Sequence, residues 1–97
     1  MLDLVDELLS NLDSVITALE QCGELRWAEW MKCARWDLRA GDAHGLDTII
    51  AAYGAAGSFD EVGYAAADLV VGERIAELRT SIYEQASQLR REVRSAD

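Results

Sequence analysis

The apolar residues of positions 3–22 repeat with the spacing of an amphipathic helix, and this pattern constrains the fold more than any other feature. They recur at alternating intervals of three and four, at Val5, Leu8, Leu12, Val15, Leu19 and Cys22. Acidic side chains follow the same spacing on the opposite side, including Asp6, Asp13 and Glu20. An α-helix places each of these sets on one face. The pattern therefore predicts a helix with an apolar face turned inward and an acidic face turned outward.

The same spacing predicts the remaining helices, with glycine as the breaker. The chain contains no proline, so breaks must fall at glycines and at capping residues. We expect Gly23 and Gly41 to end the first two helices, Asp42 to cap the third, and Gly72 to interrupt the later part of the chain. The stretch 64–72 also suits a short extended segment, but its alanines favour a helix. The predicted helices cover 3–22, 24–40, 43–53, 64–72 and 73–95.

These helices define the expected fold. The connections between the first three are short, which predicts antiparallel neighbours. Ninety-seven residues are typical of one domain. The fold class is therefore all-α: a compact antiparallel bundle of four main helices, with a glycine-rich loop between helices 3 and 4, and residues 1–97 as a single domain.

The charge of the chain is strongly negative and unevenly distributed. The net charge is −9, and residues 1–24 carry six acids and no lysine or arginine. Residues 42–64 carry four acids and a single histidine as their only basic residue. Such a field repels nucleic acid and anionic lipid and attracts basic proteins. We therefore expect neither a nucleic acid nor a membrane as a partner; simple solubility is the alternative role of this charge.

The composition also predicts where the protein is found. The first residues are acidic and lack the basic region and apolar stretch of a secretory signal. No apolar run approaches the roughly 20 residues that span a bilayer. We therefore expect a cytoplasmic protein in which the two cysteines, Cys22 and Cys33, are reduced.

The segment 53–61 has the composition of a loop with a defined shape. Gly54 and Gly57 allow backbone angles that other residues avoid. Ser58 and Glu61 have the spacing of a capping box, which predicts a new helical turn at this point. We interpret Gly54, Gly57, Ser58 and Phe59 as a structural loop.

Several of these residues resemble a group of small uncharacterised bacterial helical proteins. That group combines a tryptophan-rich helix, a Gly-Asp break and a loop of the type aromatic-Gly-Gly-x-Gly-Ser-Phe-Asn-Asp-Leu. Here the matching residues are Trp27, Trp30, Ala34, Leu38, Gly41, Asp42, Gly45, Leu46 and 53–62, followed by the closing helix at 74–84.

The resemblance covers most of residues 20–90 and departs from the group's loop at four positions. Ala55 stands where the second glycine is usual, and Asp60, Glu61 and Val62 replace asparagine, aspartate and leucine. These changes are mild for a structural loop. The resemblance implies an all-helical fold and, by analogy with small acidic bacterial proteins, an immunity-protein-like role.

The sequence offers little support for catalysis or for a bound cofactor. The glycine loop lacks the lysine of a phosphate-binding loop and has carboxylates where a phosphate would lie, so capping by Ser58 is the simpler interpretation. Cys22, Cys33 and His44 match no zinc spacing. No nucleophile–histidine–acid arrangement follows from the spacing. We therefore predict a protein that is not an enzyme and has no metal and no cofactor.

Two surfaces are candidates for binding a partner. Trp36 lies off the core side of its helix, beside Lys32 and Arg39, and tryptophan and arginine are common binding hot spots. Burial of Trp36 under the glycine loop or the last helix is the alternative. The second surface is the acidic row Asp6, Asp13 and Glu20, whose alternative is an ordinary solvated face. The loop carboxylates Asp60 and Glu61 complete the candidate contact residues.

Three functions follow from these features. The first is an immunity protein, or antitoxin-like inhibitor, that neutralises a cognate toxin with a basic surface. The second is a self-associating assembly protein, a homodimer formed by pairing of helices 3–22 and 73–95 between subunits. The third is a small-ligand-binding domain that uses Ser58, Asp60 and Glu61.

Overall fold

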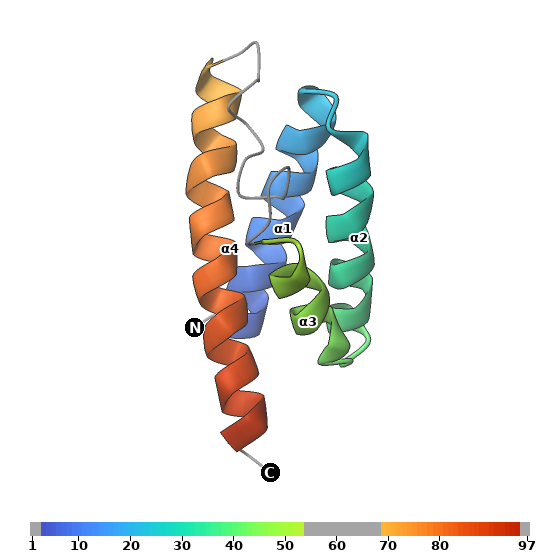
Figure 1. Cartoon of the computed structure of the whole chain (residues 1–97), viewed down its shortest axis with the longest axis vertical. Helices are drawn as coiled ribbons and strands as arrows, with labels where there is room; N and C mark the ends of the chain where they lie inside the picture. Colours follow the sequence, from blue (N-terminus) through green and yellow to red (C-terminus); the bar gives the residue numbers. More distant parts are fainter. Residues whose placement is uncertain (1–2, 54–68, 96–97) are drawn as a thin grey trace.

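The computed structural model describes residues 3–53 and 69–95, and these residues form four helices (Figure 1). They are α1 (Leu4–Gln21), α2 (Leu25–Arg39), α3 (His44–Ala51) and α4 (Leu69–Ser95). The described ranges contain no strand. The expected all-α antiparallel bundle is confirmed. The glycine-loop residues Gly54, Gly57, Ser58, Phe59, Asp60 and Glu61 lie outside the described residues.

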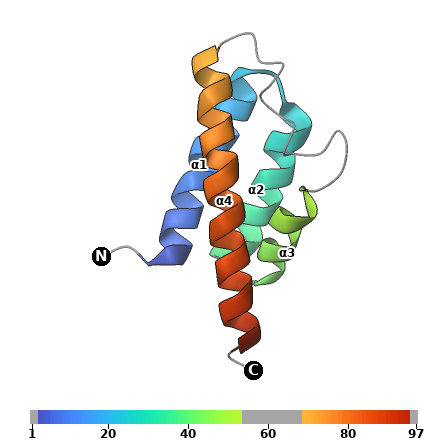
Figure 2. The same ribbon diagram turned by 60° about the vertical axis from the view of Figure 1, so that its left-hand side comes forward.

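The four helices pack in a closed order around one core. α1 lies between α2 and α4 and runs antiparallel to both, and α3 packs against α2 and α4 (Figures 1 and 2). Each helix contributes side chains that are fully buried or nearly so, as its apolar spacing predicts. They include Leu8, Leu12, Val15, Leu19, Met31, Ala34, Leu46, Ile49, Ile75, Ile82 and Ala86. Val5 and Val93, at the ends of the predicted apolar stripes, are 36% and 45% exposed.

Glycines end α1 and α2 in the same way. Gly23 and Gly41 have φ of 81° and 83°, a left-handed conformation that other residues adopt only at a cost. The N–H group of Glu24 donates to the Leu19 carbonyl, and that of Asp42 donates to the Asp37 carbonyl. These are the bonds of a Schellman motif, so both predicted stops are confirmed. Each motif lets the chain reverse direction within a few residues before the next helix begins.

The start of α3 lies one residue later than predicted, with Ala43 and not Asp42 at the N-cap position, but Asp42 still bonds the first turn. The Asp42 carboxylate accepts a hydrogen bond of 2.9 Å from the His44 N–H group. The helix is seated on α2 by a hydrogen bond of 2.8 Å from the Trp30 indole to the Thr48 carbonyl. A Cβ atom added at Gly45 would lie 2.7 Å from the Ala34 carbonyl oxygen. The glycine therefore allows α3 to approach the backbone of α2.

One predicted break is wrong. Gly72 lies inside α4, which already begins at Leu69 instead of at residue 73. Glycine costs a helix interior only about 1 kcal/mol relative to alanine. Packing of α4 against α1 outweighs that cost, because tertiary contacts supply most of the stability of a helix in a protein. The helix expected at 64–72 is confirmed for residues 69–72, and the rest of that stretch lies outside the described residues.

Tyr53 ties the end of α3 to α4, and the bond is testable. Its hydroxyl donates a hydrogen bond of 2.8 Å to the Arg79 carbonyl, and its ring lies 4.9 Å from that of Tyr83. Tyr53→Phe is expected to lower the free energy of unfolding by about 1 kcal/mol, because the partly buried bond is lost. Urea denaturation followed by circular dichroism measures the change. Tyr83→Phe is the matched control, since the Tyr83 hydroxyl makes no hydrogen bond within the described residues.

Candidate functional site

The acidic row of α1 faces outward, as predicted. Asp6, Asp13 and Glu20 are all exposed, and intervals of seven residues keep them on one line along the helix. Beneath them, Leu8, Leu12, Val15 and Leu19 anchor the same helix in the core. The acidic row therefore belongs to a helix that is packed in the core, and not to a loop.

Two of the three carboxylates form ion pairs with α2. The Arg35 Nε atom contacts Oδ1 of Asp13, and the Lys32 ammonium lies 3.0 Å from Oε2 of Glu20. Side chains of these acids remain 57% and 46% exposed. Asp6 has no ion pair within the described residues. In the acidic row, the charges of Asp13 and Glu20 are therefore partly neutralised by basic residues of α2, whereas Asp6 is without an ion pair within the described residues.

Lys32 is held between helices. Besides Glu20, it lies 3.2 Å from Oε1 of Glu29 on its own helix. The hydrogen bonds to Glu20 and then to Glu29 raise the pKa of the Lys32 ammonium above its ordinary value. Its contribution to stability is therefore present at neutral pH and is lost only when strongly alkaline solution deprotonates it. The sequence analysis grouped Lys32 with Trp36, and the structure shows it turned towards the carboxylates.

Trp36 is an exposed side chain on the outer face of α2. It is 77% exposed, so the alternative in which the last helix buries it is wrong. The tryptophans on the inner side differ: Trp27 is buried, and Trp30 is half-buried and bonded to α3. Arg39 is exposed one turn beyond Trp36, as predicted. Leu25, three turns before it, is 62% exposed. Leu25 and Trp36 are three turns apart, so they are two separate exposed apolar side chains and not one continuous patch.

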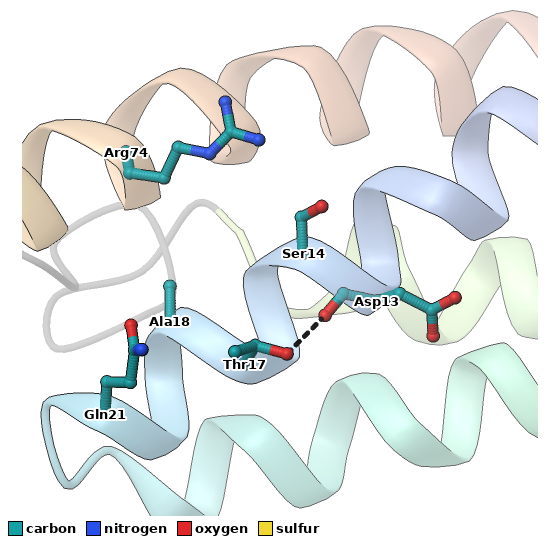
Figure 3. A pocket seen from close by; sticks show the side chains of 6 residues that line it. All are labelled: Asp13, Ser14, Thr17, Ala18, Gln21 and Arg74. Carbon is teal, nitrogen blue, oxygen red and sulfur yellow. Dashed lines mark hydrogen bonds between the residues drawn. The ribbon is translucent and has the colours of Figure 1, made fainter.

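A polar hollow between α1 and α4 was not predicted. It has a volume of about 390 Å³ and is lined by Asp13, Ser14, Thr17, Ala18, Gln21 and Arg74 (Figure 3). The Arg74 side chain reaches from α4 towards Ser14 of α1. Thr17 uses its hydroxyl to donate to the Asp13 carbonyl at 3.1 Å. Only the packing of α1 on α4 brings Arg74 to this place, so the spacing along the sequence contains no signal for it.

Metal-ligating and nucleophilic residues are dispersed. The described residues contain no group of three side chains of the kinds that hold a metal. Cys22 and Cys33 are free thiols, one half-buried and one exposed. His44 lies 3.6 Å from an Asp37 carboxylate oxygen, at the junction of α2 and α3. Of the described helices, none has the length and apolar character needed to cross a membrane.

The comparisons with known proteins agree with the family resemblance only at a coarse level. No curated protein and no solved structure matches the chain. The matched region found among family models runs from the last turn of α1 through α2 and α3, and includes Trp36, Gly45 and the glycine loop. Residues 20–64 match the model described as Domain of unknown function (DUF6966), so this part of the chain is similar to an uncharacterised family.

Proposed function

We propose that this protein is a non-enzymatic binding module that recognises a basic protein through the acidic row of α1, Asp6, Asp13 and Glu20. More narrowly, we propose an immunity-type inhibitor whose partner is a toxin. One observation carries the proposal: the three carboxylates are exposed along one line of a helix anchored in the core. Arginine and lysine side chains that line a basic site are the complementary groups.

The ion pairs to α2 support binding and do not exclude it. Each pair uses one oxygen atom, Oδ1 of Asp13 or Oε2 of Glu20. A carboxylate accepts more than one hydrogen bond, so the second oxygen remains available for a guanidinium of the partner. The pairs also restrict the positions of both side chains. Less side-chain freedom is then lost when the partner binds.

The net charge of −9 adds a long-range electrostatic attraction to the contacts that the acidic row would make with a basic partner. It attracts a basic protein before contact and so raises the association rate. Salt screens this attraction, with a Debye length of about 8 Å at physiological ionic strength. The association rate constant is therefore expected to fall as salt is added.

Removal of the acidic row tests the proposal. The variant D6N/D13N/E20Q is expected to lose most capture of a partner from cells that express the chain, as measured by quantitative mass spectrometry. The side chains keep their shape and lose their charge, and Glu20→Gln also removes the exposed ion pair with Lys32. Asp13→Asn also weakens the exposed pair with Arg35, which costs at most about 1 kcal/mol and leaves the fold intact.

The matched control is E73Q/E77Q/E84Q on α4, where all three acids are exposed. Both variants have a net charge of −6, because each removes three of the eighteen acidic charges from a chain with a net charge of −9. Loss of the captured protein from the α1 variant alone supports the proposal. Equal loss from both variants assigns the effect to net charge, and full capture by a folded α1 variant removes the row from the proposed function. Co-expression of the captured protein then shows whether it is toxic and whether this chain suppresses the toxicity.

A further inference from the structure

The hollow between α1 and α4 is lined by a cation without a counter-charge. Arg74 is exposed, and its guanidinium has no ion pair or hydrogen bond within the described residues. Asp13, the carboxylate of α1 that lines the hollow, turns away from Arg74 and pairs with Arg35 of α2 (Figure 3). Glu73 and Glu77, the neighbouring acids of α4, form no ion pair with Arg74 either.

Further hydrogen-bond donors line the same hollow. The Ser14 hydroxyl points from α1 towards α4, with the Arg74 guanidinium above it, and the Gln21 amide lies two turns further along α1 (Figure 3). Neither Ser14 nor Gln21 has a side-chain hydrogen bond within the described part of the chain. A carboxylate accepts from all three kinds of donor, and its two oxygens match the planar fork of a guanidinium. The hollow is therefore suited to a carboxylate.

A small carboxylate free in solution would gain little from this hollow. Arg74 is exposed, and water and salt screen an exposed ion pair. The same pair becomes stronger when a protein covers the hollow and excludes water. Covering also makes an unpaired Arg74 costly, because a charge removed from water without a partner is destabilising. The suitable carboxylate is therefore one that belongs to a protein lying across α1 and α4.

The acidic row passes beside this hollow. Asp13 is the central residue of the row and also lines the hollow. A helix with its side chains is about 10–12 Å across. A standard interface buries about 800 Å² on each protein, which is a patch about 30 Å wide. A partner that lies along the row therefore covers Arg74 as well. We propose, on the basis of the proposed function, that the basic partner carries a carboxylate that enters the hollow and pairs with Arg74.

This pairing makes recognition depend on the pattern of charge and not only on its total. Basic side chains of the partner meet Asp6, Asp13 and Glu20, and an acidic side chain about one helix width away meets Arg74. A basic protein without that carboxylate would leave Arg74 covered and unpaired, and would place its own cations near the guanidinium. Such a mismatch discriminates between partners of similar net charge.

Arg74→Gln tests the inference, because the two alternatives predict effects of opposite sign. The variant has a net charge of −10, one positive charge fewer than the wild type at −9, so uniform attraction to a basic protein predicts equal or tighter binding. We expect instead that the dissociation constant rises at least tenfold, since the partner's carboxylate is left covered and unpaired. The partner is the protein captured in the experiment above, purified and titrated with each variant by calorimetry.

Arg91→Gln is the matched control. Arg91 is also an exposed arginine of α4 without an ion pair within the described residues, and it lies about 25 Å further along the helix. The control has the same net charge of −10, because it also removes one positive charge from a chain at −9. It is expected to bind the partner as tightly as the wild type or more tightly. Circular dichroism confirms that both variants are folded.

Charge exchange identifies the carboxylate. R74E is expected to abolish binding of the wild-type partner, and reversal of one acidic residue on the partner's contact surface to arginine is expected to restore it. R74Q that binds as tightly as R91Q, or failure of every such reversal to restore binding of R74E, would overturn the inference and leave the acidic row in place. Full capture by D6N/D13N/E20Q, or no captured protein with the wild type, would overturn the proposed function and this inference with it.

Discussion

Gly45→Ala is expected to lower the free energy of unfolding by about 2–3 kcal/mol, although alanine is the better helix former. The new Cβ atom would lie 2.7 Å from the Ala34 carbonyl oxygen and 2.8 Å from Cγ of Leu38. The first of these is backbone of α2 at a fully buried residue, so it has little freedom to move. Relief of the overlap requires α3 to shift away from α2 as a unit.

Urea denaturation of the wild type and of the Gly45→Ala variant, followed by circular dichroism, measures the effect. Gly23→Ala is the control, because nothing lies within 4 Å of its added Cβ atom and only the φ of 81° opposes the change. That strain costs about 1–2 kcal/mol. If Gly45→Ala is as stable as the wild type or more stable, α3 does not lie against α2 as described. A shift of the bond from Trp30 to Thr48 would be seen as a change in tryptophan fluorescence.

Leu12→Ala is expected to cost about 3 kcal/mol, within the range of about 2–5 kcal/mol measured for leucine in protein cores. Leu12 is fully buried on the inner face of α1, so truncation leaves a cavity and removes its transfer free energy. A loss of this size is a large part of the total stability of about 5–15 kcal/mol for a domain. Thermal and urea denaturation should both show it.

Leu25→Ala applies the same substitution at a residue that is 62% exposed. Its expected effect on the free energy of unfolding is within about 0.5 kcal/mol. The difference between the two variants isolates the contribution of burial, because the helix propensities of leucine and alanine are similar. Equal losses at both positions would contradict the assignment of Leu12 to the core and Leu25 to the surface.

The helices were predictable because their signals are local. The spacing of apolar residues predicted α1, α2 and α3 to within two residues at each end, and Gly23 and Gly41 marked two stops. Gly72 misled the prediction, because the cost of a glycine is local whereas the packing that outweighs it is tertiary. Gly45 shows the reverse case: its role depends on the backbone of Ala34, eleven residues earlier, and no periodic pattern reveals it.

The positions of the candidate surfaces were predictable from the sequence, but the ion pairs that their side chains form were not. Helical spacing placed Asp6, Asp13 and Glu20 on the outer side of α1 and Trp36 on the outer side of α2, and the structure agrees. Which acids are compensated depends on the register between α1 and α2, because the bases that pair with Asp13 and Glu20 come from the second helix. Sequence spacing contains no information on that register.

The packing of α1 against α4 determines when the protein acquires its structure during synthesis. α1 is made early and α4 is made late, yet the two helices pack against each other in the finished bundle. At about 5–20 residues per second, the ribosome needs about 4–15 s to progress from the end of α1 to the end of α4. During that time the apolar face of α1 lacks its contacts with α4, and exposed apolar surface of this kind favours chaperone binding and aggregation. A stop codon introduced before α4 would therefore yield a chain that is degraded, and not a smaller bundle.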